Sequence, residues 1–374
     1  MDQKGPQVSS LEDIDLSVLT GRKSIDINKQ ALARSIAGKT AMITGGGGSI
    51  GSSLADLLIG SGVSELTLFD NNEHSLFYLQ QRLSEAARRI PIHLVLGDLR
   101  DRSKVRYILQ RQRPQLVYHL GAYKHVPVAE CNADEVAAVN ILGSLNVVEE
   151  AISAGVERFV YPSTDKAVQP PSIYGATKRI VELLLQAIAR ERPDSTKIRA
   201  VRLVNTVGAQ GGVIRVFAEQ IGLGLPITVT DERMTRYWIS MDEATCFVAQ
   251  AAFTEGIKGI MMLDMGDAVK LTDVARRLWD LLGPEGRELE VRHVGMRPGE
   301  RLHESLMYPY ESRHKTPYSG IFDIRSQKGP TLSLADLLAA VESIRGLVGR
   351  HDCETVSRAL FSLVEAENGE RSKH

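Results

Sequence analysis

A short apolar strand that runs directly into a glycine-rich turn and a helix constrains the fold of this chain more than any other feature. The apolar run 40–44 leads into Gly-Gly-Gly-Gly-Ser-Ile-Gly at 45–51, and leucines at helical spacing follow. Glycines at this spacing permit a tight turn and let backbone N–H groups approach a pyrophosphate at a helix N-terminus. A flexible glycine-rich linker is the alternative, but the flanking strand and helix favour a dinucleotide-binding turn. The predicted cofactor-binding residues of this turn are Gly45, Gly48, Ser49, Ile50 and Gly51.

A second apolar run ends in an acid at the distance that such turns use. The run 65–70 predicts a strand, and Asp70 follows Gly51 by 19 residues (70 − 51). A carboxylate there can accept hydrogen bonds from the adenosine ribose, with Asn71 beside it as a further cofactor contact. No Arg follows to hold a 2′-phosphate, so the sequence favours NAD over NADP. A solvated aspartate at the end of a strand is the alternative interpretation.

Strands and helices continue to alternate to residue 204. Strands expected at 92–96, 115–120, 159–161 and 198–204 are separated by helices at 73–89, 101–112, 133–154 and 174–190. This alternation predicts an α/β fold with a doubly wound parallel sheet of the Rossmann type, with residues 39–204 as the NAD-binding domain. Two strand ends would supply cofactor contacts, Asp98 and Leu99 near the adenine, and Gly121 and Ala122 near the middle of the cofactor.

Asn140 interrupts the largely apolar helix expected at 133–154. A mid-helix asparagine is disfavoured unless its amide group is used, so we expect this side chain to make hydrogen bonds.

A tyrosine and a lysine at helical spacing stand behind these strands. Tyr174 and Lys178 are four residues apart, so they share one face of the predicted helix. An ammonium beside a phenol favours the phenolate, which would serve as the base for a sugar hydroxyl during hydride transfer. Such a pair is more often found on a surface helix by chance, but its place after a buried strand and a dinucleotide turn favours a catalytic role.

The polar cluster that ends the strand before this helix adds a second chemistry. Ser163 and Thr164 can hydrogen-bond the oxygen that the tyrosine approaches. Asp165 and Lys166 add an acid/base pair that a plain alcohol dehydrogenase does not need. A solvated Thr-Asp-Lys turn is the alternative.

Shorter elements follow residue 204 and predict a smaller C-terminal substrate-binding lobe. We assign it residues 205–330, allowing return strands to the sheet, and place it over the carboxyl edge of the strands, where ligands bind in such folds. Residues 1–38 are expected to be an N-terminal arm, disordered over 1–10, and residues 331–374 to be C-terminal helices and a tail that frays after Glu367.

The basic residues of the predicted lobe are spaced singly. Arginine suits bidentate phosphate contact, although some of the lobe's arginines would lie on the surface. The predicted substrate-binding residues are Lys124, Asn205, Arg215, Arg236, Arg297 and Glu300.

The composition excludes several classes of function. Lys and Arg total 45 and Asp and Glu total 46, giving a net charge of -1, so no global field recruits nucleic acid or an anionic membrane. The three cysteines lie far apart without a CxxC, and no ligand partner stands at helical spacing from His125, so we expect neither a disulfide framework nor a metal site. The chain shows no signal peptide and no apolar run of about 18 residues. We therefore expect a cytoplasmic protein without membrane insertion.

With these residues in view, the chain resembles the extended short-chain dehydrogenase/reductase superfamily. Within it, the chain is similar to the nucleotide-sugar 4,6-dehydratases of the CapD-like polysaccharide-biosynthesis family, of the UDP-N-acetylglucosamine type. The motifs that carry the likeness are Thr-Gly-Gly-Gly-Gly-Ser-Ile-Gly at 44–51, Ala-Tyr-Lys-His-Val-Pro at 122–127, Ser-Thr-Asp-Lys-Ala-Val at 163–168, Met-Thr-Arg-Tyr at 234–237 and Gly-Met-Arg-Pro-Gly-Glu at 295–300. The likeness covers roughly residues 10–310. The membrane region of the large members is not found in this chain, which therefore resembles a free-standing catalytic domain.

The resemblance implies a mechanism. Thr164, Asp165 and Lys166 match the dehydratase triad, and Tyr174 and Lys178 match the reductase pair. Hydride would leave the sugar C4 for bound NAD while Tyr174 takes the hydroxyl proton, and the new ketone would acidify the C5–H bond. Lys166 would be the base at C5 and Asp165 the acid for the departing C6 hydroxyl, or these roles would be exchanged, before the hydride returns to C6.

Several alternatives stay open at this point. The large members usually carry Met at the position of Tyr174, and Arg301 stands where Lys is commoner, so the stereochemistry at C5 and the product are not fixed. A nucleotide-sugar 4-epimerase would share NAD, Tyr174 and Lys178 but would not need Asp165 or Lys166. A catalytically idle NAD-binding regulator is the non-enzyme alternative. A homo-oligomer is expected, either a dimer through two long helices or a hexamer.

Overall fold

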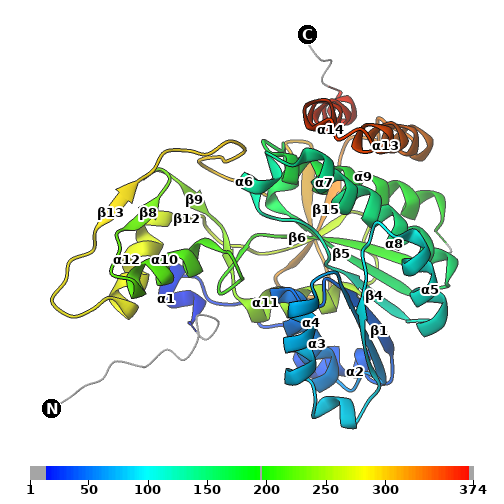
Figure 1. Cartoon of the computed structure of the whole chain (residues 1–374), viewed down its shortest axis with the longest axis horizontal. Helices are drawn as coiled ribbons and strands as arrows, with labels where there is room; N and C mark the ends of the chain where they lie inside the picture. The colour runs from blue at the N-terminus through cyan, green and yellow to red at the C-terminus, as the bar shows by residue number, and fades with distance from the viewer. Residues whose placement is uncertain (1–13, 194–195, 370–374) are drawn as a thin grey trace.

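A single large sheet organises most of the chain in the computed structural model (Figure 1). Within residues 14–193 and 196–369, which are those that the structure describes, the sheet has nine strands in the order β14-β15-β11-β6-β5-β4-β1-β2-β3. Their bounds are β1 (Thr40–Thr44), β2 (Glu65–Asp70), β3 (Ile92–Leu96), β4 (Leu116–His119), β5 (Arg158–Thr164), β6 (Lys197–Leu203), β11 (Ile260–Leu263), β14 (Glu311–Lys315) and β15 (Ile321–Ser326). All neighbours from β3 to β11 pair in parallel, and β15 and β14 add an antiparallel edge. The predicted doubly wound α/β fold is confirmed.

Helices cover both faces of this sheet, as the buried parallel strands require. One face packs against α2 (Lys29–Ile36), α3 (Ser49–Gly60), α4 (Glu73–Arg82) and α11 (Met241–Ala251). The other packs against α5 (Arg102–Gln112), α7 (Ala133–Ala137), α8 (Ser144–Ser153), α9 (Ile173–Glu191), α13 (Leu334–Val348) and α14 (Cys353–Asn368). The chain order reverses between β1 and β4, so the carboxyl ends of these two strands flank the crevice where such folds bind ligands.

The helix expected at 133–154 contains a widened turn. Between α7 and α8 the segment η3 (Ala138–Gly143) is a π-helix, a form that often marks functional sites. The span Ala133–Ser153 is long and apolar enough to cross a membrane by length and composition, and 83% of the residues in its most apolar window are buried inside the fold. It is therefore a core helix of this domain.

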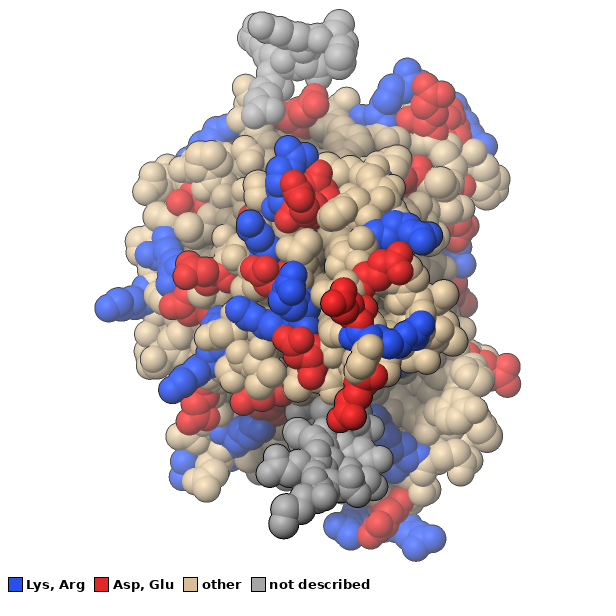
Figure 2. All heavy atoms as spheres, turned by 90° about the vertical axis from the view of Figure 1, so that its left-hand side faces the viewer, with Lys and Arg blue, Asp and Glu red and all other residues tan. Residues whose placement is uncertain are grey.

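A smaller lobe stands beside the carboxyl edge of the sheet. It contains α1 (Leu16–Thr20), α10 (Val213–Gly222), α12 (Leu271–Leu282) and the parallel pair β8 (Ile227–Val229) and β13 (Val291–His293), around a separate apolar core. Two small pairs complete it, β7 (Asn205–Thr206) with β10 (Trp238–Ile239) and β9 (Thr235–Arg236) with β12 (Val269–Lys270). Figure 2 shows acidic and basic side chains interspersed over the face that includes this lobe, in keeping with the balanced net charge.

The N-terminal segment and the residues 205–330 each pack partly on the sheet and partly in the smaller lobe. The N-terminal segment supplies α1 to the lobe and α2 to the sheet, so it packs along much of its described length. The expected disorder of residues 1–10 and the tail at 370–374 lie outside the described residues. Within 205–330, α11, β11, β14 and β15 return to the sheet, and the rest forms the lobe. The shorter helical segments are η2 (Ala86–Arg88), α6 (Val126–Ala129) and η4 (Asp165–Ala167).

Candidate active site

The glycine turn between β1 and α3 has no room for side chains at its key positions. A Cβ atom on Gly51 would lie 2.1 Å from the carbonyl oxygen of Gly45, and one on Gly45 would lie 2.7 Å from the backbone nitrogen of Gly121. Gly45 also has a φ of 68°, which favours glycine. Gly48 is the N-cap of α3 and offers no side-chain hydrogen bond to the helix, so the first N–H groups remain able to bind an anion. The turn fits a dinucleotide pyrophosphate.

Asp70 stands at the carboxyl end of β2 beside this turn. Its carboxylate accepts hydrogen bonds from the backbone N–H groups of Gly47 and Asn72, and each of these bonds is 2.9 Å long. Among the described residues, no arginine or lysine forms an ion pair with it. Asp98 at the next strand end is held differently, because the guanidinium of Arg100 hydrogen-bonds its carboxylate and lowers its pKa.

The loop after β4 is tied to two helices by the amide of Asn140, a side chain of η3. Its Oδ1 accepts from the backbone N–H of Tyr123 over 2.8 Å, and its Nδ2 donates to the carbonyl of Tyr123 over 3.0 Å and to Thr177 Oγ1 over 3.1 Å. The prediction that this amide makes hydrogen bonds is confirmed. The π-turn that carries it positions the loop containing Gly121 and Ala122 against the start of α9.

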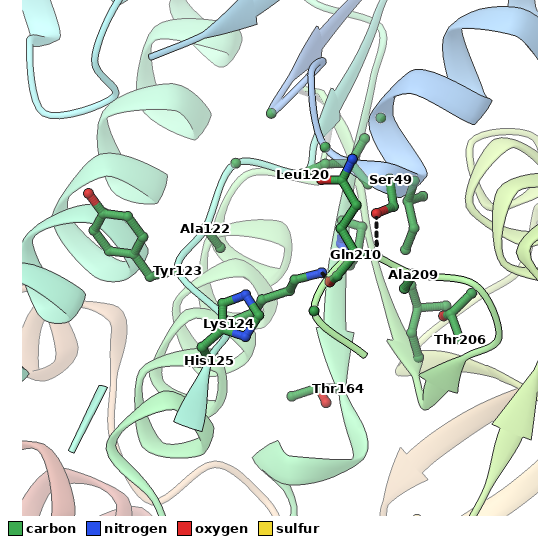
Figure 3. Close-up of a pocket in the computed structure, with 18 of the residues that line it drawn as sticks. Ser49, Leu120, Ala122, Tyr123, Lys124, His125, Thr164, Thr206, Ala209 and Gln210 are labelled. Atoms are coloured by element: carbon green, nitrogen blue, oxygen red, sulfur yellow. Dashed lines mark hydrogen bonds between the residues drawn. The ribbon is translucent and has the colours of Figure 1, made fainter. Parts of the chain in front are cut away.

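A cavity of roughly 570 Å³ lies over the carboxyl ends of these strands (Figure 3). Its walls come from the glycine turn, the strand ends, the start of α9 and the loop 205–213. The sequence-predicted residues that line it are Gly45, Gly48, Ser49, Ile50, Gly51, Asp70, Asn71, Asp98, Leu99, Gly121, Ala122, Lys124, Thr164, Lys166, Tyr174, Lys178 and Asn205. The structure therefore brings the expected cofactor residues and four of the five expected catalytic residues to one cavity.

The segment 208–212, here called the strap, lies over the glycine turn. The backbone N–H of Gln210 donates to Ser49 Oγ over 2.9 Å, and its carbonyl accepts from Lys124 Nζ over 3.0 Å (Figure 3). Gly211 packs so closely on His125 that a Cβ atom there would lie 2.4 Å from the imidazole. Burial lowers the pKa of Lys124. The contacts place this lysine between the strap and the cavity.

The polar cluster at the end of β5 is a linked chain of hydrogen bonds. Asp165 is 1% exposed and its Oδ1 accepts from Thr164 Oγ1 over 2.9 Å and from Lys166 Nζ over 3.0 Å. Asp165 does not line the cavity itself; it contacts the two residues that do. Its Oδ2 has no hydrogen-bond partner within the described part of the chain.

Lys166 faces a second carboxylate that the sequence analysis missed. Its Nζ lies 3.6 Å from Oε1 of Glu304, a residue of the loop between β13 and β14. Burial lowers the pKa of Lys166, but the carboxylates of Asp165 and Glu304 outweigh burial, so the net pKa is raised. Lys166 is therefore an ammonium at neutral pH. In the sequence, Glu304 is marked only by its place four residues after Glu300, and that spacing does not connect it with Lys166.

The geometry of Tyr174 and Lys178 differs from the prediction. Burial raises the pKa of Tyr174, and the opposing influences come from Lys166 and from a hydrogen bond with the Thr164 side chain. Lys178 instead lies with its Nζ 4.0 Å from the ring centroid of Tyr161, and burial lowers its pKa to about 7 despite the nearby Glu182. The prediction that Lys178 lowers the pKa of Tyr174 is wrong for this structure, because burial dominates both groups.

The predicted phosphate-binding arginines do not reach the cavity. Arg236 is buried and donates to the carbonyls of Thr235 and Leu302. Arg215 donates to the carbonyl of Gly208 over 3.4 Å, at the base of the strap. Arg297 is exposed, and its backbone N–H donates to Glu300 over 3.0 Å. Lys124 and Asn205 are the only predicted substrate residues, within the described part of the chain, that line the cavity.

Metal ligation has no support in the described residues. Between residues 14 and 369, apart from 194–195, no three His, Cys, Asp or Glu side chains gather closely enough to hold a metal ion.

Comparison with known proteins agrees with this geometry. The family described as "Polysaccharide biosynthesis protein" matches residues 41–326, and the chain belongs to that family. The capsular polysaccharide biosynthesis protein CapD of Staphylococcus aureus is 36% identical over 84% of this chain and 53% of its own length. The chain thus spans about half the length of that relative.

Two further proteins are informative about chemistry. An inverting UDP-N-acetylglucosamine 4,6-dehydratase of Campylobacter jejuni is 31% identical over 80% of this chain and 85% of its own length. Among solved structures, the Thermus thermophilus UDP-glucose 4-epimerase in complex with NAD is 25% identical, with a TM-score of 0.61 over 71% of this chain and 90% of that chain.

Proposed function

We propose that this member of the polysaccharide biosynthesis family is an NAD-dependent nucleotide-sugar 4,6-dehydratase that acts on UDP-N-acetylglucosamine or a related nucleotide hexose. The observation that carries the proposal is the ammonium of Lys166 held by two carboxylates in the cavity that Tyr174 and Lys178 also line. A plain alcohol oxidation needs no such group. The name of the Campylobacter jejuni relative, most of whose length the chain covers, supports the same reaction and substrate.

The cofactor site is proposed to hold NAD with its pyrophosphate at the N-terminus of α3. The glycine cradle at 45–51 admits the phosphates, and Asp70 would turn its carboxylate toward the adenosine ribose. Bound NAD would supply the hydride acceptor for the sugar C4 and return the hydride at C6. Lys124 and Asn205 are proposed to contact the nucleotide diphosphate sugar.

Proton removal from the C4 hydroxyl is assigned to Tyr174. Its raised pKa makes it a phenol in the resting protein, so it must pass its own proton on when it accepts one. Thr164 offers that path, because its side chain is hydrogen-bonded to Tyr174 and donates to Asp165 over 2.9 Å. Lys178 lines the same cavity, and because its pKa is about 7, its amine can gain or lose a proton near neutral pH.

The elimination is assigned to Lys166 and Asp165. Oxidation at C4 acidifies C5–H; its electron pair forms the C5–C6 double bond while the C6–O bond breaks, and the leaving oxygen takes a proton to become water. Because Lys166 is an ammonium, we assign it as the donor to that oxygen. The proton that Asp165 received from Tyr174 through Thr164 then restores the ammonium across the Lys166–Asp165 hydrogen bond, and the Asp165 carboxylate so freed accepts the C5 proton. This is the exchanged form of the assignment that the resemblance first implied.

The test is product analysis with a panel of nucleotide sugars. The wild-type protein should convert one of them to a 4-keto-6-deoxy sugar, seen as loss of one water by mass spectrometry and as solvent deuterium at C5 by proton NMR in heavy water. Lys166→Ala and Asp165→Asn should lose the elimination yet keep NAD binding. Full product formation by both variants would overturn the assignment.

A 4-epimerase is the competing candidate, favoured by the structural likeness to a UDP-glucose 4-epimerase in complex with NAD. It would interconvert the C4 configuration without losing water, and it would tolerate both substitutions. The same mass and NMR measurements separate the two reactions.

The cellular setting also stays a proposal. We expect the protein to act in the cytoplasm as a homo-oligomer. Most of α9, one of the long helices, is buried, with α13 and α14 packed against it, so the expected dimer would need another surface. Light scattering of the purified protein measures the oligomeric state directly.

A further inference from the structure

Glu304 is a buried carboxylate that lies beside the reaction centre. It is 8% exposed, and its Oε1 is 3.6 Å from Lys166 Nζ and 3.9 Å from Arg236 Nε. Its Oε2 is completely buried and has no hydrogen-bond partner in the part of the chain that the structure describes. A buried carboxylate without full hydrogen bonding is costly, so a role in the site is a better explanation than packing.

The loop that carries Glu304 is anchored to the smaller lobe. The carbonyl of Leu302 accepts from the backbone N–H of Thr235 over 2.9 Å and from Arg236 Nη1 over 3.2 Å. Thr235 Oγ1 also lies 2.9 Å from His303 Nδ1. Strand β9 therefore fixes the loop immediately before the carboxylate, and the lobe delivers Glu304 to a lysine in the turn that follows β5.

Charged and titratable groups from four segments surround the Lys166 amine and decide whether it is charged. Asp165 faces it from its own turn, Glu304 from the loop after β13, Arg236 from β9 and Tyr174 from α9. The two carboxylates favour the ammonium and Arg236 opposes it. A hydrogen bond to Asp165 by itself would not fix where Nζ lies, so a second carboxylate is needed.

We propose that Glu304 is a positioning residue that, together with Asp165, holds the Lys166 ammonium in place and keeps it charged until it donates its proton to the departing C6 hydroxyl. The inference rests on the proposed dehydratase function. It assigns to the smaller lobe a part in the proton chemistry as well as in substrate binding.

The first test compares the wild-type protein with Glu304→Gln, which keeps the shape and removes the charge. We expect elimination to slow by about tenfold or more, and the basic limb of its pH profile to move down by roughly one pH unit, because Lys166 loses its proton more readily. Oxidation at C4, followed by the absorbance of the reduced nicotinamide, should stay within about twofold. Movement of the acidic limb instead would show that Lys166 acts as a base and would overturn the donor role.

The second test does not depend on turnover. The pH dependence of Lys166 labelling by an amine-reactive reagent, measured by peptide mass spectrometry, reports the charge of this lysine in the folded protein. Its midpoint should fall in Glu304→Gln, and Glu304→Asp, which keeps the charge but withdraws it, should lie between the two. Glu290→Gln removes an exposed carboxylate of the same lobe and should leave the midpoint unchanged.

The outcomes separate the two proposals. A wild-type protein that forms no 4-keto-6-deoxy sugar from any nucleotide sugar would sink the proposed function, while the labelling would still decide whether Glu304 keeps Lys166 charged. An unchanged labelling midpoint in both folded Glu304 variants would overturn the inference about Glu304 whatever the reaction proves to be.

Discussion

The side-chain amide of Asn140 joins the loop after β4 to the catalytic helix, because its Nδ2 donates to Thr177 Oγ1 over 3.1 Å while the same amide brackets the backbone of Tyr123. Asn140 is completely buried. Thr177 in turn donates to the carbonyl of Tyr174 over 2.8 Å. One residue of a π-turn therefore connects the cofactor loop with the helix that carries the tyrosine.

Asn140→Ala should destabilise the fold by about 2–4 kcal/mol, because three hydrogen bonds are lost, one of them between two completely buried side chains. Urea unfolding measures the change, and calorimetry with NAD should show weaker binding. Asn132→Ala removes an exposed asparagine whose side chain donates to the carbonyl of Val128, and it should change stability by less than about 0.5 kcal/mol. Equal effects of both substitutions would contradict this account.

Two glycines of α3 offer a matched comparison. Gly51→Ala would place a methyl group 2.1 Å from the carbonyl of Gly45, so the turn must open, and we expect NAD affinity to fall at least about tenfold. Gly60→Ala meets nothing within 4 Å and should leave affinity unchanged and stability slightly higher, by about 0.5 kcal/mol. Calorimetric titration and thermal unfolding measure both, and tight NAD binding by Gly51→Ala would remove the pyrophosphate site from the turn.

Local patterns in the sequence were sufficient to predict the parallel strands β1 to β6, the glycine turn and the use of Asn140. Each of these depends on residues within about one helical turn or one strand, where periodicity and backbone geometry act directly. The cluster at Asp165 and Lys166 was also found this way, since both follow one buried strand.

The remaining features depend on contacts between distant segments. Glu304 meets Lys166 only because the lobe folds over the sheet, and no spacing rule connects two loops 138 residues apart (304 − 166). The pKa of Tyr174 depended on how deeply α9 is buried, which the tyrosine–lysine spacing does not encode. Strands β11, β14 and β15 likewise join the sheet through contacts between segments that are distant in the sequence.

Lys178 should make stability depend on pH above neutrality. The unfolded chain binds its proton up to a pKa of 10.5, but the folded protein only up to about 7, so the unfolded state binds more protons between these values. Stability from this group therefore rises with pH across that window, by up to about 1.4 kcal/mol per pH unit. Subtracting the unfolding free energy of Lys178→Met from that of the wild type at each pH isolates the contribution. A difference that stays flat from pH 7 to about 10 would contradict the burial of an uncharged lysine.

His119 should act in the opposite part of the pH range. Its imidazole is buried between Thr44 Oγ1, 2.7 Å from Nδ1, and Ser144 Oγ, 2.8 Å from Nε2. Burial lowers its pKa from 6.5 to about 3, so between these values the unfolded state binds a proton that the folded state does not. Stability from this group is therefore complete above about pH 6.5 and is lost as the pH falls toward 3, again by up to about 1.4 kcal/mol per unit. Urea unfolding from pH 4 to 7 should show a steeper acid loss for the wild type than for His119→Gln, while His74→Gln, at an exposed position of α4, should follow the wild type. If His119→Gln loses stability in acid as steeply as the wild type, the imidazole takes up its proton in the folded core, and the two hydroxyl contacts do not hold it neutral.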